Sequence, residues 1–153
     1  MGGLLEILVA SRHSEMRRSI VTILRRLGID PICASTVGQS LEVLAERNIG
    51  LVFCDRQFAD GSYRDLMASV SSGPRKSATR VVLTTGFVNP GEYHQAKQSG
   101  VFDVIASPDH PIAVEWMVIL AQRDALKRCD QTVVVWPPAI SGFRTAAAAA
   151  GKA

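Results

Sequence analysis

The amino-acid sequence predicts an α/β protein with one open, doubly wound, five-stranded parallel sheet. Short apolar runs alternate with amphipathic stretches between residues 4 and 128, which is the pattern of repeated strand–helix units. One run, Leu51 to Cys54, is apolar at every position, as expected of a strand that is buried on both faces. Units of this length favour parallel strands with right-handed crossovers and helices on both faces of the sheet.

Each predicted strand is an apolar run that is bounded by turn-forming residues. The predicted strands are Leu4 to Ala10, Pro31 to Ala34, Leu51 to Cys54, Val81 to Thr85 and Val101 to Ala106. The helices between them begin after side chains that can accept a hydrogen bond from the first helical turn. The predicted N-terminal caps are Ser14, Ser35 or Thr36, Asn89, and Asp109 or His110. A turn at Asp60-Gly61-Ser62 leads into the third helix.

The composition is that of an ordinary globular protein, with 47% hydrophobic and 20% charged residues. The net charge of +3 is spread along the chain, so we expect no nucleic-acid partner. Cys33, Cys54 and Cys129 form no CxxC motif, which favours reduced thiols in a cytoplasmic protein and no zinc site. The first apolar run is short and interrupted by Glu6, so we expect neither a signal peptide nor a membrane span.

The functional cleft of such a sheet lies beyond the carboxyl ends of its strands. The residues at or just after the predicted strand ends are Ser11, Arg12, His13, Asp55, Thr84, Thr85 and Ser107. They contain no nucleophile with an adjacent base and an orienting group, and phosphate-binding glycine motifs are absent from the sequence. The sequence therefore predicts a protein that is not an enzyme.

These strand ends resemble those of the receiver domains of bacterial response regulators, over about residues 4 to 128. The resemblance depends on the order and spacing of the segments ILVASRHSEMRRSI, LVFCD, VVLTT and DVIASP. It implies a flavodoxin-like (βα)5 fold with strand order 2-1-3-4-5. It also implies that Asp55 stands at the phosphoacceptor position and that Thr84 is the retained hydroxyl.

The chain departs from this family at the residues that carry the phosphorylation chemistry. Ser11 and Arg12 stand where the family has two acidic residues, Ser107 stands where it has a lysine, and Val104 stands where it has an aromatic residue. The loop between Asp55 and the following glycine is about two residues shorter than usual. One carboxylate is a poor site for Mg²⁺, so we expect no metal or other cofactor, and Mg²⁺ only if Asp55 is phosphorylated.

Arg12 is the most informative of these substitutions. A guanidinium group at this position can form a bidentate pair with the Asp55 carboxylate. One hypothesis is therefore a fixed Arg12–Asp55 ion pair in place of the metal. The alternative is that Arg12 points to solvent and Asp55 caps a loop.

The last predicted helix is apolar nearly all the way round, because residues 112 to 121 read IAVEWMVILA. One stripe must face the sheet, and the other, with Trp116, is a predicted partner surface. The family resemblance implies a possible homodimer through helices four and five. We expect a receiver-like domain over residues 1–128 and a partly disordered tail over residues 129–153, with a strand-like patch from Val133 to Trp136.

Taken together, the residues and the resemblance favour a stand-alone signalling module of a two-component or phosphorelay system. We expect it to act in the cytoplasm through contact with a protein such as a histidine kinase or a downstream signalling protein. Two alternatives remain open. The first is a functional phosphoacceptor receiver that uses Asp55. The second is a flavodoxin-like small-molecule-binding protein or enzyme, because one fold hosts many functions.

Overall fold

Five apolar segments pair side by side into one parallel sheet. They are β1 (Ile7–Ala10), β2 (Ile32–Ala34), β3 (Leu51–Asp55), β6 (Arg80–Thr84) and β7 (Asp103–Ile105). Their order is β2-β1-β3-β6-β7, which confirms the predicted order, because the short strands β4 and β5 lie outside this sheet. The structure is a computed structural model that describes residues 5–72, 79–85, 89–106 and 110–135.

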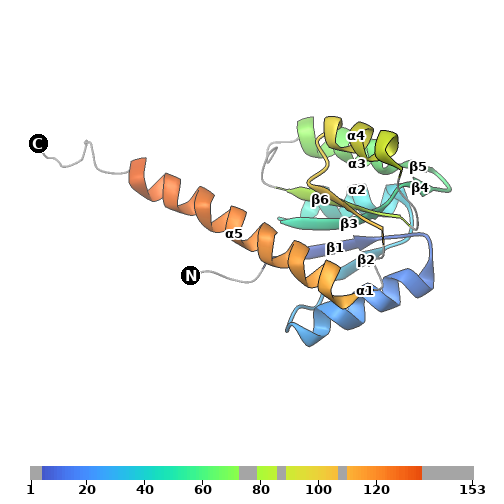
Figure 1. The fold of residues 1–153 in the computed structure, drawn as a ribbon, viewed down its shortest axis with the longest axis horizontal. Coiled ribbons are helices and arrows are strands. Elements are labelled where there is room, and N and C mark those ends of the chain that lie inside the picture. The colour runs from blue at the N-terminus through green and yellow to red at the C-terminus, as the bar shows by residue number, and fades with distance from the viewer. Residues whose placement is uncertain (1–4, 73–78, 86–88, 107–109, 136–153) are drawn as a thin grey trace, which may run out of the picture. The chain divides into compact units, whose positions relative to one another are not determined.

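Five helices accompany the sheet. They are α1 (Ser14–Arg26), α2 (Val37–Glu46), α3 (Tyr63–Ser72), α4 (Pro90–Gln98) and α5 (Pro111–Val135). The chain divides into two compact units, Met1–Ala121 and Gln122–Ala153, and the sheet belongs to the first. Within this unit, α1 lies on one face of the sheet, and α2, α3 and α4 lie on the other (Figure 1).

The side chains of β1 show how the sheet divides the core in two. Leu8 and Ala10 belong to a buried cluster with residues of α2, α3 and α4, whereas Ile7 and Val9 belong to a second cluster with residues of α1 and α5. Successive side chains of a strand point to opposite faces. Because both faces are covered, each central strand is apolar throughout, and the polar residues gather at the strand ends.

Local capping explains where several helices begin. The Thr36 side chain accepts a hydrogen bond from the Gln39 N–H, and Asn89 Oδ1 accepts one from the Glu92 N–H at 2.8 Å, so both predicted caps are confirmed. The prediction that Ser14 caps α1 is wrong. Ser14 is the first helical residue, and the N-cap position belongs to His13, whose backbone N–H is held by Ser11 Oγ at 3.1 Å.

Helix α5 extends to Val135, beyond the predicted end near Arg128. The prediction of a strand-like patch is therefore wrong for residues 133–135, which are helical. Trp136 lies outside the described residues. The reason is local, because neither glycine nor proline occurs between Pro111 and Pro137 to stop the helix. Among the described residues, no helix combines the length and the apolar composition needed to cross a bilayer.

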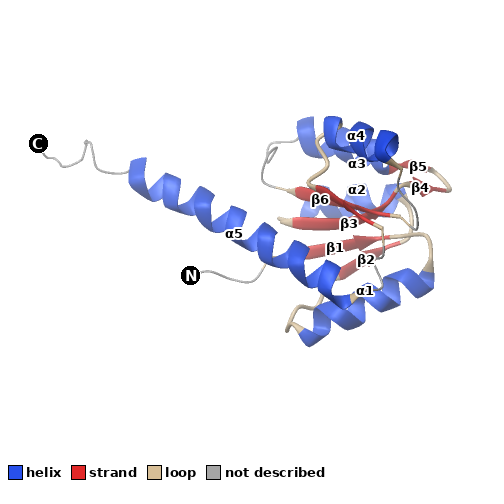
Figure 2. Cartoon of the chain, viewed as in Figure 1, coloured by secondary structure: helices blue, strands red, loops and turns tan. Residues whose placement is uncertain are grey.

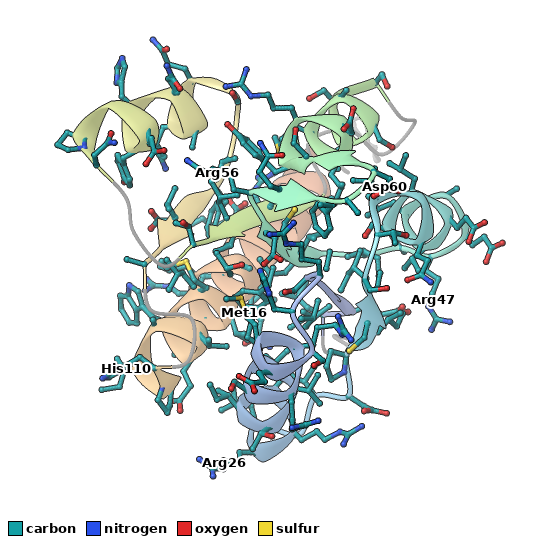
Figure 3. The ribbon with its side chains drawn as sticks, turned by 90° about the vertical axis from the view of Figure 1, so that its right-hand side faces the viewer. Met16, Arg26, Arg47, Arg56, Asp60 and His110 are labelled. Atoms are coloured by element: carbon teal, nitrogen blue, oxygen red, sulfur yellow. The ribbon has the colours of Figure 1, made fainter. Side chains whose placement is uncertain are left out.

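A small hairpin replaces the simple turn that was predicted before α3. Strands β4 (Gln57–Phe58) and β5 (Gly61–Ser62) pair antiparallel just after β3 (Figure 2). Asp60 at its tip reaches the start of α2, where its carboxylate accepts the Val37 N–H at 2.9 Å and the Gly38 N–H at 3.0 Å. These two backbone hydrogen bonds lower the pKa of Asp60. The hairpin is thereby tied to a neighbouring helix (Figure 3).

Asp60→Asn is expected to lower the midpoint of thermal unfolding at neutral pH, because the helix start loses a charged acceptor. The pKa of Asp60 is lowered in the folded state, so its contribution is complete above the unfolded-state pKa and is lost as the pH falls through the folded-state pKa. Melting curves at neutral and acidic pH should show a difference between the two proteins that disappears on acidification.

Asp30→Asn provides the control, because Asp30 is exposed and pairs only across the surface with Arg25 at 3.2 Å. Surface ion pairs contribute little to stability, so this variant should melt close to the unmodified protein at neutral pH. An Asp60→Asn deficit that persists unchanged at acidic pH would contradict the role of the carboxylate charge.

Candidate functional site

Asp55 lies at the carboxyl end of the central strand β3, and only 5% of its surface is exposed. One carboxylate oxygen, Oδ2, accepts the Ser11 hydroxyl at 2.9 Å and the Arg12 backbone N–H at 3.0 Å. The other, Oδ1, lies 3.3 Å from the Thr84 hydroxyl oxygen. Donors of the protein therefore engage Oδ2, and the Thr84 hydroxyl lies within hydrogen-bond distance of Oδ1, in keeping with the need of a buried charge for polar partners.

The register of the sheet brings these residues together from distant parts of the sequence. Ala10 of β1 pairs with Cys54 of β3, and Asp55 pairs with Thr84 of β6. Ser11, the next residue after β1, therefore stands beside Asp55. The sequence correctly predicts this meeting of strand ends, since the carboxyl ends of parallel strands share one edge of a sheet.

Ser11 is held by more than its contact with Asp55. It is 1% exposed, its backbone N–H donates to the Ala34 carbonyl at 3.0 Å, and its own carbonyl accepts Arg17 Nη1 at 2.6 Å. These bonds connect it to β2 and to α1. The serine is thus a fixed donor to the carboxylate, rather than a surface residue that happens to lie near it.

The predicted ion pair between the side chains of Arg12 and Asp55 is wrong. Arg12 reaches the carboxylate with its backbone N–H, while its exposed guanidinium group lies against His13, with Nε 3.3 Å from the imidazole Nε2. The reason is geometric. Side chains alternate along an extended chain, so when Ser11 points inward at the end of β1, Arg12 points outward.

Thr84 completes the site from β6. Its hydroxyl oxygen lies 3.2 Å from the Cys54 carbonyl oxygen and 3.3 Å from Asp55 Oδ1, so its single proton serves one of two acceptors. Burial, with a smaller contribution from Asp55, raises the pKa of the Cys54 thiol. This cysteine therefore stays protonated beside the site and behaves as a small core residue.

The residues at the site do not fit a magnesium ion. The described residues contain no group of three or more His, Cys, Asp or Glu side chains that could hold a metal. Asp55 already accepts hydrogen bonds from protein donors on Oδ2, and the neighbouring Ser11 contributes a neutral hydroxyl that points at it. Mg²⁺ prefers carboxylate oxygens in octahedral geometry, and this donor set does not supply them.

Two of the other predicted site residues, Val104 and Trp116, lie among the described residues. Val104 is half-buried on β7, where it pairs in register with Leu83. Trp116 lies on α5 and is 52% exposed, so it does not pack fully against its own sheet. Ser107 lies outside the described residues.

A second polar cluster, beside α4, was missed by reasoning from the sequence. Arg56, the residue after Asp55, forms an ion pair with Glu92 of α4 through Nη1 and Oε2. Figure 3 labels Arg56 next to α4. This pair stands at the rim of a cavity of about 320 Å³ that is also lined by Val104 and Thr85. A sequence analysis that included the first residue beyond each strand end would have singled out Arg56. Nothing local in the sequence indicates that this residue pairs with Glu92.

Comparisons with known proteins agree on the fold. No family model matches the chain, and no curated protein matches it. Among solved structures, a CheY-like response regulator receiver domain protein from Methanospirillum hungatei JF-1 is 17% identical at a TM-score of 0.73, covering 82% of this chain and 99% of that one. Chemotaxis response regulator CheY4 of Vibrio cholerae is 13% identical at a TM-score of 0.71, covering 78% and 99%.

A third neighbour has a higher sequence identity over a shorter span. The N-terminal domain of a response regulator receiver protein from Methanoculleus marisnigri JR1 is 25% identical at a TM-score of 0.60, covering 67% of this chain and 84% of that one. The chain therefore has the fold of the CheY-like receiver domains, and the fold that the sequence resemblance implies is confirmed.

Asp55→Ala is expected to reduce the free energy of unfolding by about 1–3 kcal/mol, because the Arg12 N–H and the Ser11 hydroxyl lose their buried acceptor. Urea unfolding at neutral pH measures this change. Ser11→Ala serves as the comparison and should cost less, since the carboxylate keeps the Arg12 N–H. An Asp55→Ala protein as stable as the unmodified chain would show that these hydrogen bonds contribute nothing net.

Proposed function

We propose that the chain is a receiver-like signalling module of a two-component or phosphorelay system that acts through protein contact. In this proposal it works without Mg²⁺-dependent phosphorylation of Asp55. The observation that carries it is the state of the Asp55 carboxylate, whose Oδ2 accepts the Ser11 hydroxyl and the Arg12 N–H in a buried setting. The receiver fold supports the assignment to the signalling modules. The donors that hold Asp55 support an action without phosphorylation of this residue.

The chemistry of phosphoryl transfer supports this proposal. Transfer to a carboxylate brings several negative charges together, and catalysis depends on cations that neutralise them. Around Asp55 the donors are two hydroxyl groups and a backbone N–H, all of them neutral. The guanidinium group of Arg12 faces His13 instead. Among the described residues, the donors that contact Asp55 therefore stabilise the free carboxylate and bring no positive charge to an added phosphate.

One observation favours the alternative of a functional phosphoacceptor. Asp55 and Thr84 remain side by side, with Oδ1 3.3 Å from the Thr84 hydroxyl, so a carboxylate oxygen and a hydroxyl face each other at the strand ends. In that alternative Asp55 is phosphorylated inefficiently, and Mg²⁺ is recruited only together with the phosphodonor.

Incubation with acetyl phosphate and Mg²⁺, followed by intact-mass measurement, separates the two functions. The unmodified protein is expected to show no phosphoryl adduct, because the metal-binding acids are missing. A stoichiometric adduct that is lost in Asp55→Asn would overturn the proposal and establish the phosphoacceptor alternative.

A variant that restores the family's residues serves as a positive control for the expected absence of a phosphoryl adduct on the unmodified protein. The variant Ser11→Asp/Arg12→Asp/Ser107→Lys carries the acidic pair and the lysine that the family has at these positions. This variant is expected to gain a Mg²⁺-dependent adduct under the same conditions, provided that circular dichroism shows the native fold. If it remains unmodified while folded, the substituted residues are not the reason for the lost chemistry.

The proposed contact surface is an apolar stripe on α5. Ile112, Trp116 and Ile119 are 70%, 52% and 43% exposed, and their spacing of four and three places them on one side of the helix. The buried residues of the same helix are Val114, Met117, Val118 and Ala121. The helix therefore presents a second apolar face to solvent, which is the common sign of an interaction site.

Trp116→Ala is expected to weaken self-association or partner binding by about tenfold, because aromatic anchors dominate protein interfaces. Sedimentation equilibrium over a range of concentrations measures self-association directly. Leu27→Ala is a matched control, since Leu27 is a large apolar residue of comparable exposure, 39%, at the end of α1. A chain that stays monomeric at high concentration, with or without Trp116, would count against a homodimer.

The partner that we propose is a protein, either a histidine kinase or a downstream signalling protein in the cytoplasm. We propose no enzymatic activity and no cofactor for the module. The net charge of +3 is small and dispersed, which argues against nucleic acid as the main partner. Contact through an apolar helix face suits a protein partner, because burial of apolar area drives such association.

A further inference from the structure

Asp55 is not among the lining residues of the cavity beside α4, although Arg56 and Thr85, the residues after Asp55 and Thr84, line it. The cavity has a volume of about 320 Å³ and is bounded by the β4–β5 hairpin, the start of α3, the ends of β6 and β7, and α4. The lining residues that carry the argument are Arg56, Tyr63, Arg64, Leu83, Glu92 and Val104. Cavities from about 300 Å³ upward are large enough to hold small organic ligands.

The lining is apolar on one side. Leu83 and Tyr63 are buried, with exposures of 3% and 5%. Val104 lies in register with Leu83 on the neighbouring strand. Both side chains line the cavity. The apolar side therefore offers contact to a hydrocarbon or aromatic body.

The cavity lining also carries charge. Two guanidinium groups, those of Arg56 and Arg64, and one carboxylate, that of Glu92, line the cavity, which leaves one net positive charge. Arg56 binds Glu92 through Nη1, and its guanidinium group carries further N–H donors on the other two nitrogens. Arg64 stacks over the Tyr63 ring, with its central carbon 5.7 Å from the ring centroid, which orients a planar donor group at the rim.

We propose that this cavity binds a small organic anion, with a carboxylate at Arg56 and Arg64 and an apolar body against Leu83 and Val104. Guanidinium groups bind carboxylates with charge-assisted, bidentate hydrogen bonds, and a net positive rim disfavours cations. The side-chain amides of Gln57 and Gln95 also line the cavity and supply polar contacts around such a group.

The residues that line this cavity come from separate parts of the molecule, which the Arg56–Glu92 ion pair links. Arg56 and Arg64 belong to the hairpin region and α3, whereas Glu92 belongs to α4, of which Ala96 is the buried residue. A ligand held by both sides adds contacts between α4 and the rest of the domain. The site therefore gives the module a chemical input that does not pass through Asp55.

Titration of the ¹⁵N-labelled chain with 2-naphthoate tests the proposal. The expected result is a saturable shift of the backbone amide signals of lining residues such as Gln57, Leu83 and Gln95. The neutral analogue 2-naphthalenemethanol should bind about tenfold more weakly, because it lacks the carboxylate. Octanoate in a parallel titration tests whether an aliphatic body serves as well as an aromatic one, and shifts at the same amides would extend the ligand class.

Two variants identify the site. Val104→Phe fills the apolar side and should abolish the shifts, and Arg64→Gln should weaken naphthoate binding about fivefold or more while leaving the neutral analogue unaffected. Arg18→Gln is the matched control, because Arg18 is an exposed arginine on α1 outside the cavity, and it should bind like the unmodified chain. The spectrum of each variant shows directly whether it is folded.

The proposal is overturned if neither naphthoate nor octanoate produces saturable shifts at the lining residues. It is also overturned if a folded Val104→Phe protein binds as well as the unmodified chain. The phosphodonor experiment measures a different property, the intact mass of the protein after incubation with acetyl phosphate. Either proposal can therefore fail while the other stands.

Discussion

The buried carboxylate of Asp55 is the group on which the strand-end architecture depends. A charge in a site that is 5% exposed is tolerated only when donors surround it, and here they come from the ends of β1 and β6. These hydrogen bonds hold three strand ends in one place and set the direction of the chain as it leaves β1. Because Ser11 turns inward to Asp55, Arg12 turns outward and α1 begins at Ser14.

The connection that follows β3 is shorter than is usual in receiver domains, and it forms a hairpin where a simple turn was predicted. The chain folds into the β4–β5 hairpin, whose tip places Asp60 at the N-terminus of α2. Its base places Arg56 opposite Glu92 of α4. This segment therefore contacts two helices on the same face of the sheet, α2 through Asp60 and α4 through Arg56. Its residues also line the cavity beside α4.

The site and the surfaces of this domain thus differ in their chemistry. The Asp55 carboxylate is stabilised by hydrogen bonds from a hydroxyl and a backbone amide, whereas α5 exposes apolar side chains and the cavity beside α4 has a mixed apolar and charged lining. In the function proposed above, the strand-end site stabilises an unmodified Asp55 carboxylate, and the exposed surfaces make the contacts with other proteins. Contact energy at such surfaces comes mainly from apolar burial and a few oriented charges.

The sequence by itself determined the five strands, the caps at Thr36 and Asn89, and the meeting of Asp55 with Thr84 and Ser11, while the family resemblance supplied the strand order. Apolar periodicity and helix capping are local, and parallel topology then brings the strand ends together. Only the tertiary structure decided the direction of Arg12 and the pairing of Arg56 with Glu92. The direction of Arg12 depends on the register between strands, and the pairing of Arg56 depends on the path of the hairpin. Residues that are distant in the sequence determine both.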